Sequence, residues 1–247
     1  MLIYSTGVGR RIAVESDSRA LQIEVTGHQW WWEVHYPADG KQPPVTTANE
    51  LHLPLGVPVE VTLTSDDVIH SFWVPSLAGK LDAIPGRISV IRLSAREAGE
   101  YRGQCAEFCG AQHARMAFRV LAETPGEFAA WRRARSLKAP PPGEEDRAVA
   151  AGRQAFIDHD CADCHRIRGA IPGSGQGDRL TGMHGPDLTH VASRTALGGR
   201  TLPYSRDNVE RWILHNQRLK PGNRMPDFSE LPEETADSIA DYLDTLR

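Results

Sequence analysis

Two thiols, an imidazole and a thioether lie close together in one short segment of the chain, in the order Cys105, Cys109, His113 and Met116. Copper selects soft sulfur ligands combined with imidazole, and a Cys–His–Met loop closing a β-barrel is one of its characteristic sites. Two cysteines, instead of one, allow both thiolates to bridge two copper ions. Each copper then needs its own imidazole, so a second histidine must come from elsewhere among the 10 histidines of the chain.

The same cysteine pair has two simpler explanations. Cys105 and Cys109 could form a structural disulfide, or they could hold zinc together with His113. A disulfide that closes so short a loop would stabilise the fold little, because the loop entropy it removes is small. Neither explanation accounts for Met116, so a copper site is the favoured hypothesis.

A second pair of thiols forms the pentapeptide Cys161-Ala-Asp-Cys164-His165. This pattern is the attachment signature of haem c, in which two thioether bonds fix the porphyrin and the histidine binds the iron. Taken alone, it also occurs by chance or as half of a zinc site. A methionine as the sixth iron ligand would raise the reduction potential, as in electron-carrying cytochromes. Met183 and Met225 are both candidates.

Short strands are expected to position the first pair of thiols. Between residues 21 and 120, apolar residues alternate with polar ones, as in Val57, Val59, Val61 and Leu63. Several such runs separated by glycine and proline predict a β-sandwich or barrel. A helix should follow, because Thr124, Pro125 and Glu127 form a capping box ahead of Phe128.

The pattern changes after the proline-rich segment 139–143, which predicts a stiff extended spacer. Residues 144–158 and 205–219 have helical spacing, and so does the tail with Ile239, Tyr242, Leu243 and Leu246. We therefore predict two domains: an all-β domain over residues 1–138 with a short C-terminal helix, and an all-α domain over residues 144–247.

Charge and composition exclude some classes of function. Residues 1–140 carry 15 basic and 15 acidic side chains, whereas residues 141–247 carry 13 and 17, so the net charge of −4 lies wholly in the second part. Nucleic-acid binding would need a basic patch, so no nucleic-acid partner is expected. No stretch approaches the ~20 apolar residues that span a bilayer.

Two further segments identify a resemblance for the first domain, namely residues 64–76 (TSDDVIHSFWVPS) and residues 80–87 (KLDAIPGR). They resemble subunit II of haem–copper oxidases, over a region from Gly27 to about Trp131. The resemblance implies a cupredoxin-like fold and a binuclear CuA centre. Its implied ligands are His70, Cys105, the backbone carbonyl of Glu107, Cys109, His113 and Met116. It also implies that the Glu107 carboxylate reaches a magnesium ion shared with subunit I.

The aromatic run Trp30-Trp31-Trp32 is expected to lie on a strand, with Trp30 and Trp32 on one face and Trp31 on the other. Such residues usually belong to the core. The resemblance implies that Trp30 lies where electrons enter the copper domain. Because this chain has a haem motif of its own, Trp30 is expected to face the haem domain.

The second domain resembles class I cytochromes c, in particular those fused to oxidase subunits. The resemblance rests on the cysteine pair, residues 185–188 (GPDL), a helix with Trp212, and residues 221–226 (PGNRMP). It implies that haem c is attached through Cys161 and Cys164, with His165 and Met225 as axial ligands. A CuA domain fused to this domain resembles the caa3 type of cytochrome c oxidase.

The resemblance implies an electron-accepting subunit of a terminal oxidase, with oxygen chemistry on subunit I and no catalytic residue on this chain. Its implied partners are a soluble cytochrome c as donor, oxidase subunit I and the other oxidase subunits, on the outer face of a bacterial cell membrane. Two membrane helices should precede the copper domain, and we expect a chain that starts just after them. The alternatives are a soluble electron-transfer protein serving another reductase, such as nitrous oxide reductase, and a copper-carrying assembly factor.

Overall fold

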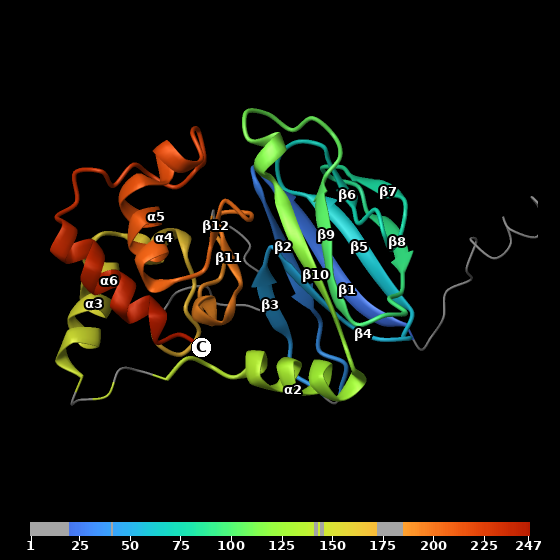
Figure 1. Cartoon of the computed structure of the whole chain (residues 1–247), viewed down its shortest axis with the longest axis horizontal. Helices are drawn as coiled ribbons and strands as arrows, with labels where there is room; N and C mark the ends of the chain where they lie inside the picture. Colours follow the sequence, from blue (N-terminus) through green and yellow to red (C-terminus); the bar gives the residue numbers. More distant parts are fainter. Residues whose placement is uncertain (1–19, 41, 141–142, 144–145, 172–184) are drawn as a thin grey trace, which may run out of the picture.

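The structure is a computed structural model of the chain, and it describes residues 20–40, 42–140, 143, 146–171 and 185–247. Two layers of β-strands fill one half of the molecule, and helices fill the other (Figure 1). Each half has a hydrophobic core of its own, the first centred on residues such as Trp32 and the second on residues such as Tyr242. The predicted all-β domain followed by a helical domain is confirmed.

Among the described residues, ten strands form the two sheets of the first half. The first sheet has the order β3-β2-β1-β5-β8 and the second β4-β10-β9-β6-β7. Their bounds are β1 Leu21–His28, β2 Trp31–Tyr36, β3 Val45–Ala48, β4 Glu50–Pro54, β5 Val59–Ser65, β6 His70–Trp73, β7 Lys80–Ala83, β8 Ser89–Leu93, β9 Gly99–Cys105 and β10 Ala117–Glu123.

The core between the two sheets follows from the alternating pattern. On β5, Val59, Val61 and Leu63 are buried and the residues between them are not, as a half-buried strand requires. Trp32 fills the centre, with its ring 5.8 Å from that of Phe72 and 5.7 Å from that of Phe118. This rigid packing fixes the strand ends that carry the cysteine loop.

Helix α2 (Pro125–Ser136) follows the last strand and begins as predicted. The Thr124 hydroxyl accepts a hydrogen bond from the Glu127 amide, and the Glu127 carboxylate accepts one from the Thr124 amide, so the capping box is complete. Phe128 and Trp131 on this helix pack against the edge of the β core. The helix therefore belongs to the first half of the molecule, although it leads toward the second (Figure 1).

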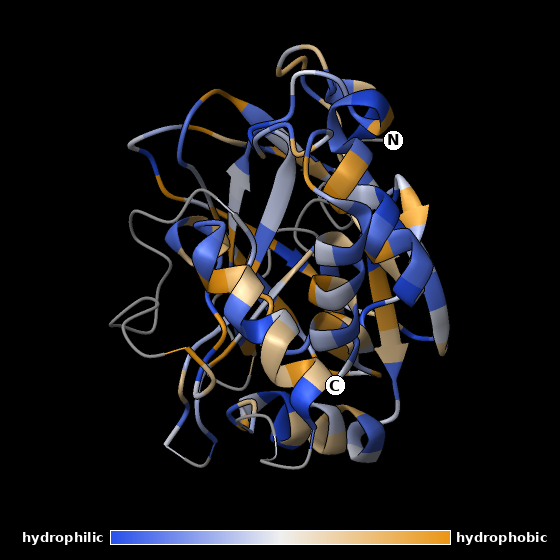
Figure 2. Cartoon of the chain, turned by 90° about the vertical axis from the view of Figure 1, so that its left-hand side faces the viewer, coloured by the Kyte–Doolittle hydropathy of each residue, from blue (hydrophilic) through white to orange (hydrophobic). Residues whose placement is uncertain are grey.

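The second half is built from α3 (Arg147–Asp158), α4 (Cys161–Cys164), α5 (Arg206–Leu219) and α6 (Glu233–Asp244), with a small ribbon of β11 (Ala196–Leu197) and β12 (Leu202–Pro203). The helices carry both hydrophobic and hydrophilic residues, as amphipathic helices around a core must (Figure 2). Gly152 allows close contact of α3 with α6, because a Cβ there would lie 1.9 Å from the Ser238 carbonyl oxygen. The predicted helices over 205–219 and in the tail are confirmed.

The proline-rich segment 139–143 begins with Ala139, which belongs to the hydrophobic core of the helical half. Ala139 is buried there, and its amide donates to the Arg168 carbonyl at 2.8 Å. The exact division into domains at residues 139–143 stays a prediction. Within the described residues, no helix combines the length and the apolar character needed to cross a bilayer.

One local prediction is wrong. Trp30 does not lie on a strand, because β1 ends at His28 and β2 starts at Trp31, which leaves Trp30 in the turn between them. As predicted, however, Trp31 faces away from the side on which Trp30 and Trp32 lie. Trp30 and Trp32 belong to the main β core, whereas Trp31 packs outside it on Ala48 and stacks on His28.

Candidate copper and haem sites

The sheet pairing brings His70 to the cysteine loop from 35 residues away in sequence. Strand β6 begins at His70 and pairs with β9, which ends at Cys105, with Phe72 opposite Cys105 in the register. His113 lies on a short 3-10 helix (His113–Arg115) that folds the loop back, and Met116 follows it. Of the six groups predicted as copper ligands, all lie in this one region.

The distances between the donor atoms suit metal coordination. The sulfur atoms of Cys105 and Cys109 are 3.7 Å apart, with His70 Nδ1 3.9 Å from the first and His113 Nδ1 3.6 Å from the second. Tetrahedral coordination, with bonds of about 2.1 Å to nitrogen and 2.3 Å to sulfur, separates donor atoms by about 3.4–3.8 Å. A disulfide has its sulfur atoms only about 2.05 Å apart, so this pair is not one.

Two further donors complete the set. The Glu107 carbonyl oxygen is 3.2 Å from the Cys105 sulfur, and the Met116 sulfur is 3.8 Å from that of Cys109. Each thiol thus has one imidazole and one additional donor beside it, with the two sulfur atoms in the middle. This arrangement fits two copper ions that share both thiolates, each with its own imidazole.

The protein prepares the first thiol for metal binding. The hydrogen bond from Cys109 lowers the pKa of the Cys105 thiol, and the hydrogen bond with His70 acts in the same direction. The same hydrogen bond to Cys105 raises the pKa of the Cys109 thiol. The thiolate is the form that binds metal, and metal binding would release the protons that the two thiols still hold.

Residues outside the predicted ligand set fix His70. The Nε2 atom of His70 is 2.8 Å from Asp67 Oδ1, which leaves Nδ1 turned toward Cys105. Burial opposes a charge on His70, but the hydrogen bond with Asp67 raises the pKa of the imidazole above its usual value. Gly27 lies flat against the ring, because a Cβ there would be 2.7 Å from His70 Cδ2. A carboxylate and a glycine thus hold the orientation of the imidazole.

Substitution of Gly27 with alanine should weaken copper binding by about 10- to 100-fold, the usual effect of disturbing the support of a ligand. The added methyl group would displace the His70 ring, and with it the Nδ1 donor, while leaving the chemical identity of every ligand unchanged. The matched control is Gly79→Ala, where nothing lies within 4 Å of the added Cβ. Copper titration by isothermal calorimetry checks this, and equal affinities of the two variants would contradict it.

The haem motif has the geometry of an attachment site. Helix α4 spans Cys161–Cys164, and both thiols are free. The Nδ1 atom of His165 is 2.8 Å from the Pro186 carbonyl oxygen, which leaves Nε2 available to an iron. Gly185 packs flat on the His165 ring, since a Cβ there would be 2.5 Å from Cε1. These residues fit haem c, because the histidine is oriented and its ring is closely packed on one side.

The candidate axial methionine lies on a loop held by side chains of α5. The Met225 amide donates to Asn223 Oδ1 at 2.9 Å, and Gln217 Nε2 donates to the Met225 carbonyl at 2.7 Å. The Met225 side chain is partly buried against the second core, as Cys161 is. Met183, the other candidate, lies outside the described residues. The assignment of Met225 stays a prediction.

Comparisons with known proteins agree with both halves of this geometry. Residues 38–123 match the family described as cytochrome c oxidase subunit II, periplasmic domain, and residues 149–247 match the cytochrome c family. The chain is 36% identical over 233 residues to cytochrome c oxidase subunit 2 of Alkalihalophilus pseudofirmus, covering 94% of this chain and 63% of that protein. The chain thus combines a domain that matches the periplasmic domain of cytochrome c oxidase subunit II with a domain that matches cytochrome c.

A second relative is covered to the same extent. Subunit 2 of Bacillus subtilis is 30% identical over 235 residues, covering 92% of this chain and 63% of that protein. The chain thus spans 63% of the length of these two curated relatives. A subunit II domain with a cytochrome c domain is consistent with the caa3 type. The solved periplasmic domain of subunit II from Bradyrhizobium japonicum is 32% identical, covering 49% of this chain and 96% of that one, with a TM-score of 0.46.

The backbone and the side chain of Glu107 have different neighbours. Its carbonyl lies beside Cys105, whereas its carboxylate is exposed and lies 4.0 Å from the Lys80 ammonium. The neighbouring Phe108 is also exposed, with 77% of its surface accessible. An acidic group and an apolar ring next to the copper ligands are thus accessible to another molecule.

Trp30 contacts the cysteine loop directly. Its indole Nε1 donates to the Cys109 carbonyl at 2.9 Å, and the neighbouring Gln29 amide group donates to the same oxygen at 2.8 Å. The side chain is only 8% exposed. The Trp30 carbonyl accepts a hydrogen bond from Lys220 of the helical domain at 2.8 Å. The expectation that Trp30 faces the haem domain agrees with this contact.

The sequence alone assigned no role to Asp67, Lys220 or Arg224, although Asp67 and Arg224 lie within two of the motifs and Lys220 directly precedes one of them. Asp67 precedes His70 by three residues, and a carboxylate so placed beside a histidine ligand is a recognisable signal. Lys220 and Arg224 flank the turn before Met225, and they contact residues that are distant in sequence. No local pattern identifies such contacts.

Proposed function

We propose that this chain is the electron-accepting subunit of a haem–copper terminal oxidase of the caa3 type. It accepts electrons from a cytochrome c at its helical domain, residues 144–247, and delivers them through its β domain, residues 1–138, toward haem a of subunit I, where O2 is reduced to water. The complex is an oxidoreductase and translocase, and this chain performs electron transfer only. The observation that carries the proposal is the presence of two electron-transfer ligand sets, of different chemistry, in one chain.

Each residue set has a defined task. His70, Cys105, Glu107, Cys109, His113 and Met116 hold the binuclear CuA centre, while Cys161 and Cys164 attach haem c with His165 and Met225 as axial ligands. When bound, these groups supply one-electron redox chemistry. The buried, hydrogen-bonded ligands restrict geometric change, which keeps the energy needed to rearrange the site small. Trp30 connects the Cys109 carbonyl to the helical domain and is the proposed route between the two halves.

The remaining partners follow from the family. The chain assembles with subunit I and the other oxidase subunits, on the outer side of a bacterial cell membrane, with N-terminal helices as the anchor. The exposed Glu107 carboxylate supports a magnesium site shared with subunit I, because it is accessible beside the copper ligands. Hard oxygen ligands of this kind suit Mg²⁺.

The described geometry favours this proposal over the alternatives. A copper-carrying assembly factor releases its metal and needs few ligands, whereas here six donors converge on the site from two sheet-linked segments. A soluble protein that serves another reductase would use the same two sites. The oxidase is preferred because relatives that match along nearly the whole chain are oxidase subunits.

Salt should slow electron delivery to this chain but not transfer within it. The acidic excess of residues 141–247, with 17 acidic and 13 basic side chains, attracts a basic cytochrome c, and salt screens this attraction over a Debye length of ~10 Å at 0.1 M. Stopped-flow reduction by a basic cytochrome c should therefore become slower as salt rises. A bimolecular rate that is independent of salt would contradict the proposed docking of the donor on the helical domain.

A further inference from the structure

A buried lysine of the helical domain ends in the copper domain. Lys220 is the C-cap residue that follows α5, and only 3% of its surface is exposed. Its ammonium donates to the Trp30 carbonyl at 2.8 Å, to the Arg115 carbonyl at 3.0 Å and to the Gly198 carbonyl at 2.9 Å. The first two acceptors belong to the copper domain, and Arg115 immediately precedes Met116.

The backbone of the turn is fixed, so the position of this cation is fixed too. Asn223 donates through its side-chain amide to the Lys220 carbonyl at 2.9 Å and to Asn216 Oδ1 at 3.0 Å. Gly222 has φ of +77°, the left-handed conformation that glycine adopts without strain. A lysine normally keeps its ammonium in water, so its burial needs acceptors in a preset place. Two of the three acceptors exist only when the domains are in contact.

A second cation lies at the other end of the same turn. Arg224 pairs with Asp67 at 3.0 Å and donates to Gln29 Oε1 at 3.3 Å. Asp67 also accepts from the Gln29 amide at 2.7 Å and contacts His70 Nε2 at 2.8 Å. Arg224 is next to Met225 in sequence. The ion pair between Arg224 and Asp67 and the hydrogen bond between Asp67 and His70 therefore connect the loop of Met225, a predicted haem ligand, to His70, a predicted copper ligand.

We propose that residues 220–225, here named the docking turn, hold the haem domain in a fixed orientation on the copper loop, with Lys220 and Arg224 as positioning residues. The importance of this orientation for electron transfer rests on the proposed function. The docking turn also binds the Trp30 carbonyl, and the side chain of Trp30 is only 8% exposed, so an external donor meets the helical domain and not the indole. The face of the copper domain that carries Trp30, Arg115 and Asp67 thus binds the haem domain of the same chain.

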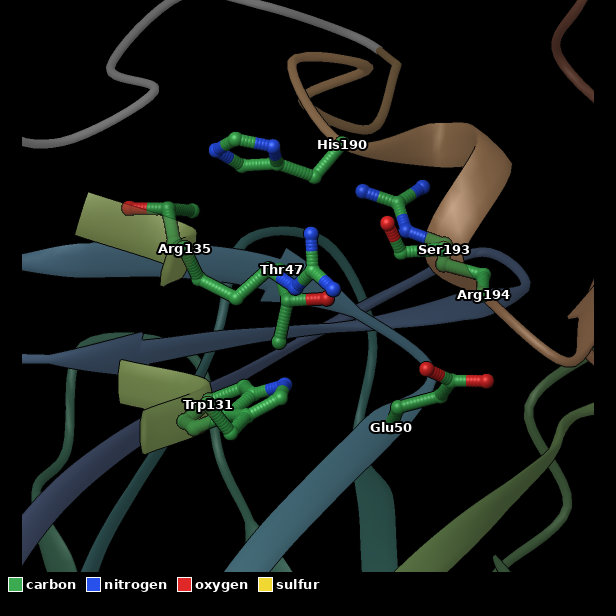
Figure 3. A pocket seen from close by; sticks show the side chains of 8 residues that line it. Thr47, Glu50, Trp131, Arg135, His190, Ser193 and Arg194 are labelled. Carbon is green, nitrogen blue, oxygen red and sulfur yellow. The ribbon is translucent and has the colours of Figure 1, made fainter. Parts of the chain in front are cut away.

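A second contact between the halves supports one fixed orientation. Glu50 on β4 accepts hydrogen bonds from the amide and the hydroxyl of Thr195 in the helical domain. Beside it is a cavity of about 10 Å³ with Arg135 on one side and Arg194 on the other (Figure 3). This volume is about that of one water molecule, so the two halves meet closely there. Two separate polar contacts define an orientation, whereas one contact alone would leave rotation free.

Amine acylation of the full-length chain with an N-hydroxysuccinimide ester, followed by mass spectrometry, tests the docking turn. The chain has 4 lysines, of which Lys80 and Lys138 are exposed and serve as internal references. Lys220 should react at least tenfold more slowly than Lys138. Replacing the partly exposed Arg224 by glutamine should raise the Lys220 rate about fivefold, the upper range for such an ion pair. The matched control Arg218→Gln removes an exposed charge near the end of α5 and should change nothing.

Small-angle scattering gives an independent measure on the full chain. Lys220→Met keeps the length of the side chain but removes the donor, and it should increase the radius of gyration while the circular dichroism of both halves is retained. Rapid labelling of Lys220 in the unmodified chain, or no response to Arg224→Gln, would overturn the proposal, and so would an unchanged radius of gyration. These measurements need no electron transfer. If they succeed and no electron passes between the halves, docking stands and the proposed function fails.

Discussion

Replacement of Cys109 by serine should abolish the binuclear copper centre. The unmodified chain refolded with copper should be purple, hold two coppers and show a mixed-valence signal with seven hyperfine lines. Both thiolates, whose sulfur atoms are 3.7 Å apart, would be needed to hold two copper ions, and one thiolate alone would not suffice. The variant should bind at most one copper and give a four-line spectrum, measured by electron paramagnetic resonance with metal analysis.

The matched control is Cys161→Ser, which removes a thiol of the other pair. It should keep the seven-line spectrum and lose only one thioether bond to haem, because the two pairs lie in separate cores. A four-line spectrum in the unmodified chain would contradict the binuclear site. A seven-line spectrum in Cys109→Ser would show that the bridging sulfur is assigned wrongly.

Replacement of Met225 by alanine should lower the reduction potential of the haem by on the order of 0.1 V or more. Axial ligands set haem potentials over a range of about 0.8 V, and a thioether ligand favours the reduced iron. The absorption band that arises from the sulfur–iron bond should disappear as well. Spectroelectrochemical titration of the full chain measures both effects.

Met183→Ala is the control, since Met183 is the other methionine that the sequence offers as a ligand. It should leave the potential and the absorption band unchanged. The reverse outcome would transfer the axial role to Met183. In both variants the haem should survive acid–acetone extraction, because thioether bonds are covalent, and loss of the colour would contradict attachment through Cys161 and Cys164.

The sequence predicted most of the ligand chemistry because the ligands are close in the chain. Cys105, Cys109, His113 and Met116 share one loop, so their types and spacing alone indicate copper. His70 is 35 residues away, and only the resemblance selected it among 10 histidines. The structure explains the selection, since β6 and β9 pair so that His70 and Cys105 meet. The contact is set by sheet register, which residue spacing does not contain.

Helices and strands were predictable where periodicity and caps agreed. The capping box at Thr124 and the alternation on β5 are local signals, and both appear in the structure. Trp30 was misplaced because an aromatic run resembles a strand, whereas Gln29 and Trp30 form the turn between β1 and β2. The contacts of Lys220 and Arg224 were beyond prediction, since docking of two domains depends on the complete surfaces of both.

One measurement tests the central claim most directly, namely that electrons pass from the helical domain to the β domain within one chain. A photoreductant injects electrons into the chain loaded with haem and copper, and absorbance follows both centres in time. The account predicts that reoxidation of the haem and reduction of the dicopper centre share one rate constant, which is independent of protein concentration and nearly independent of salt. Copper reduction that proceeds without haem reoxidation, or at a rate proportional to protein concentration, would contradict it.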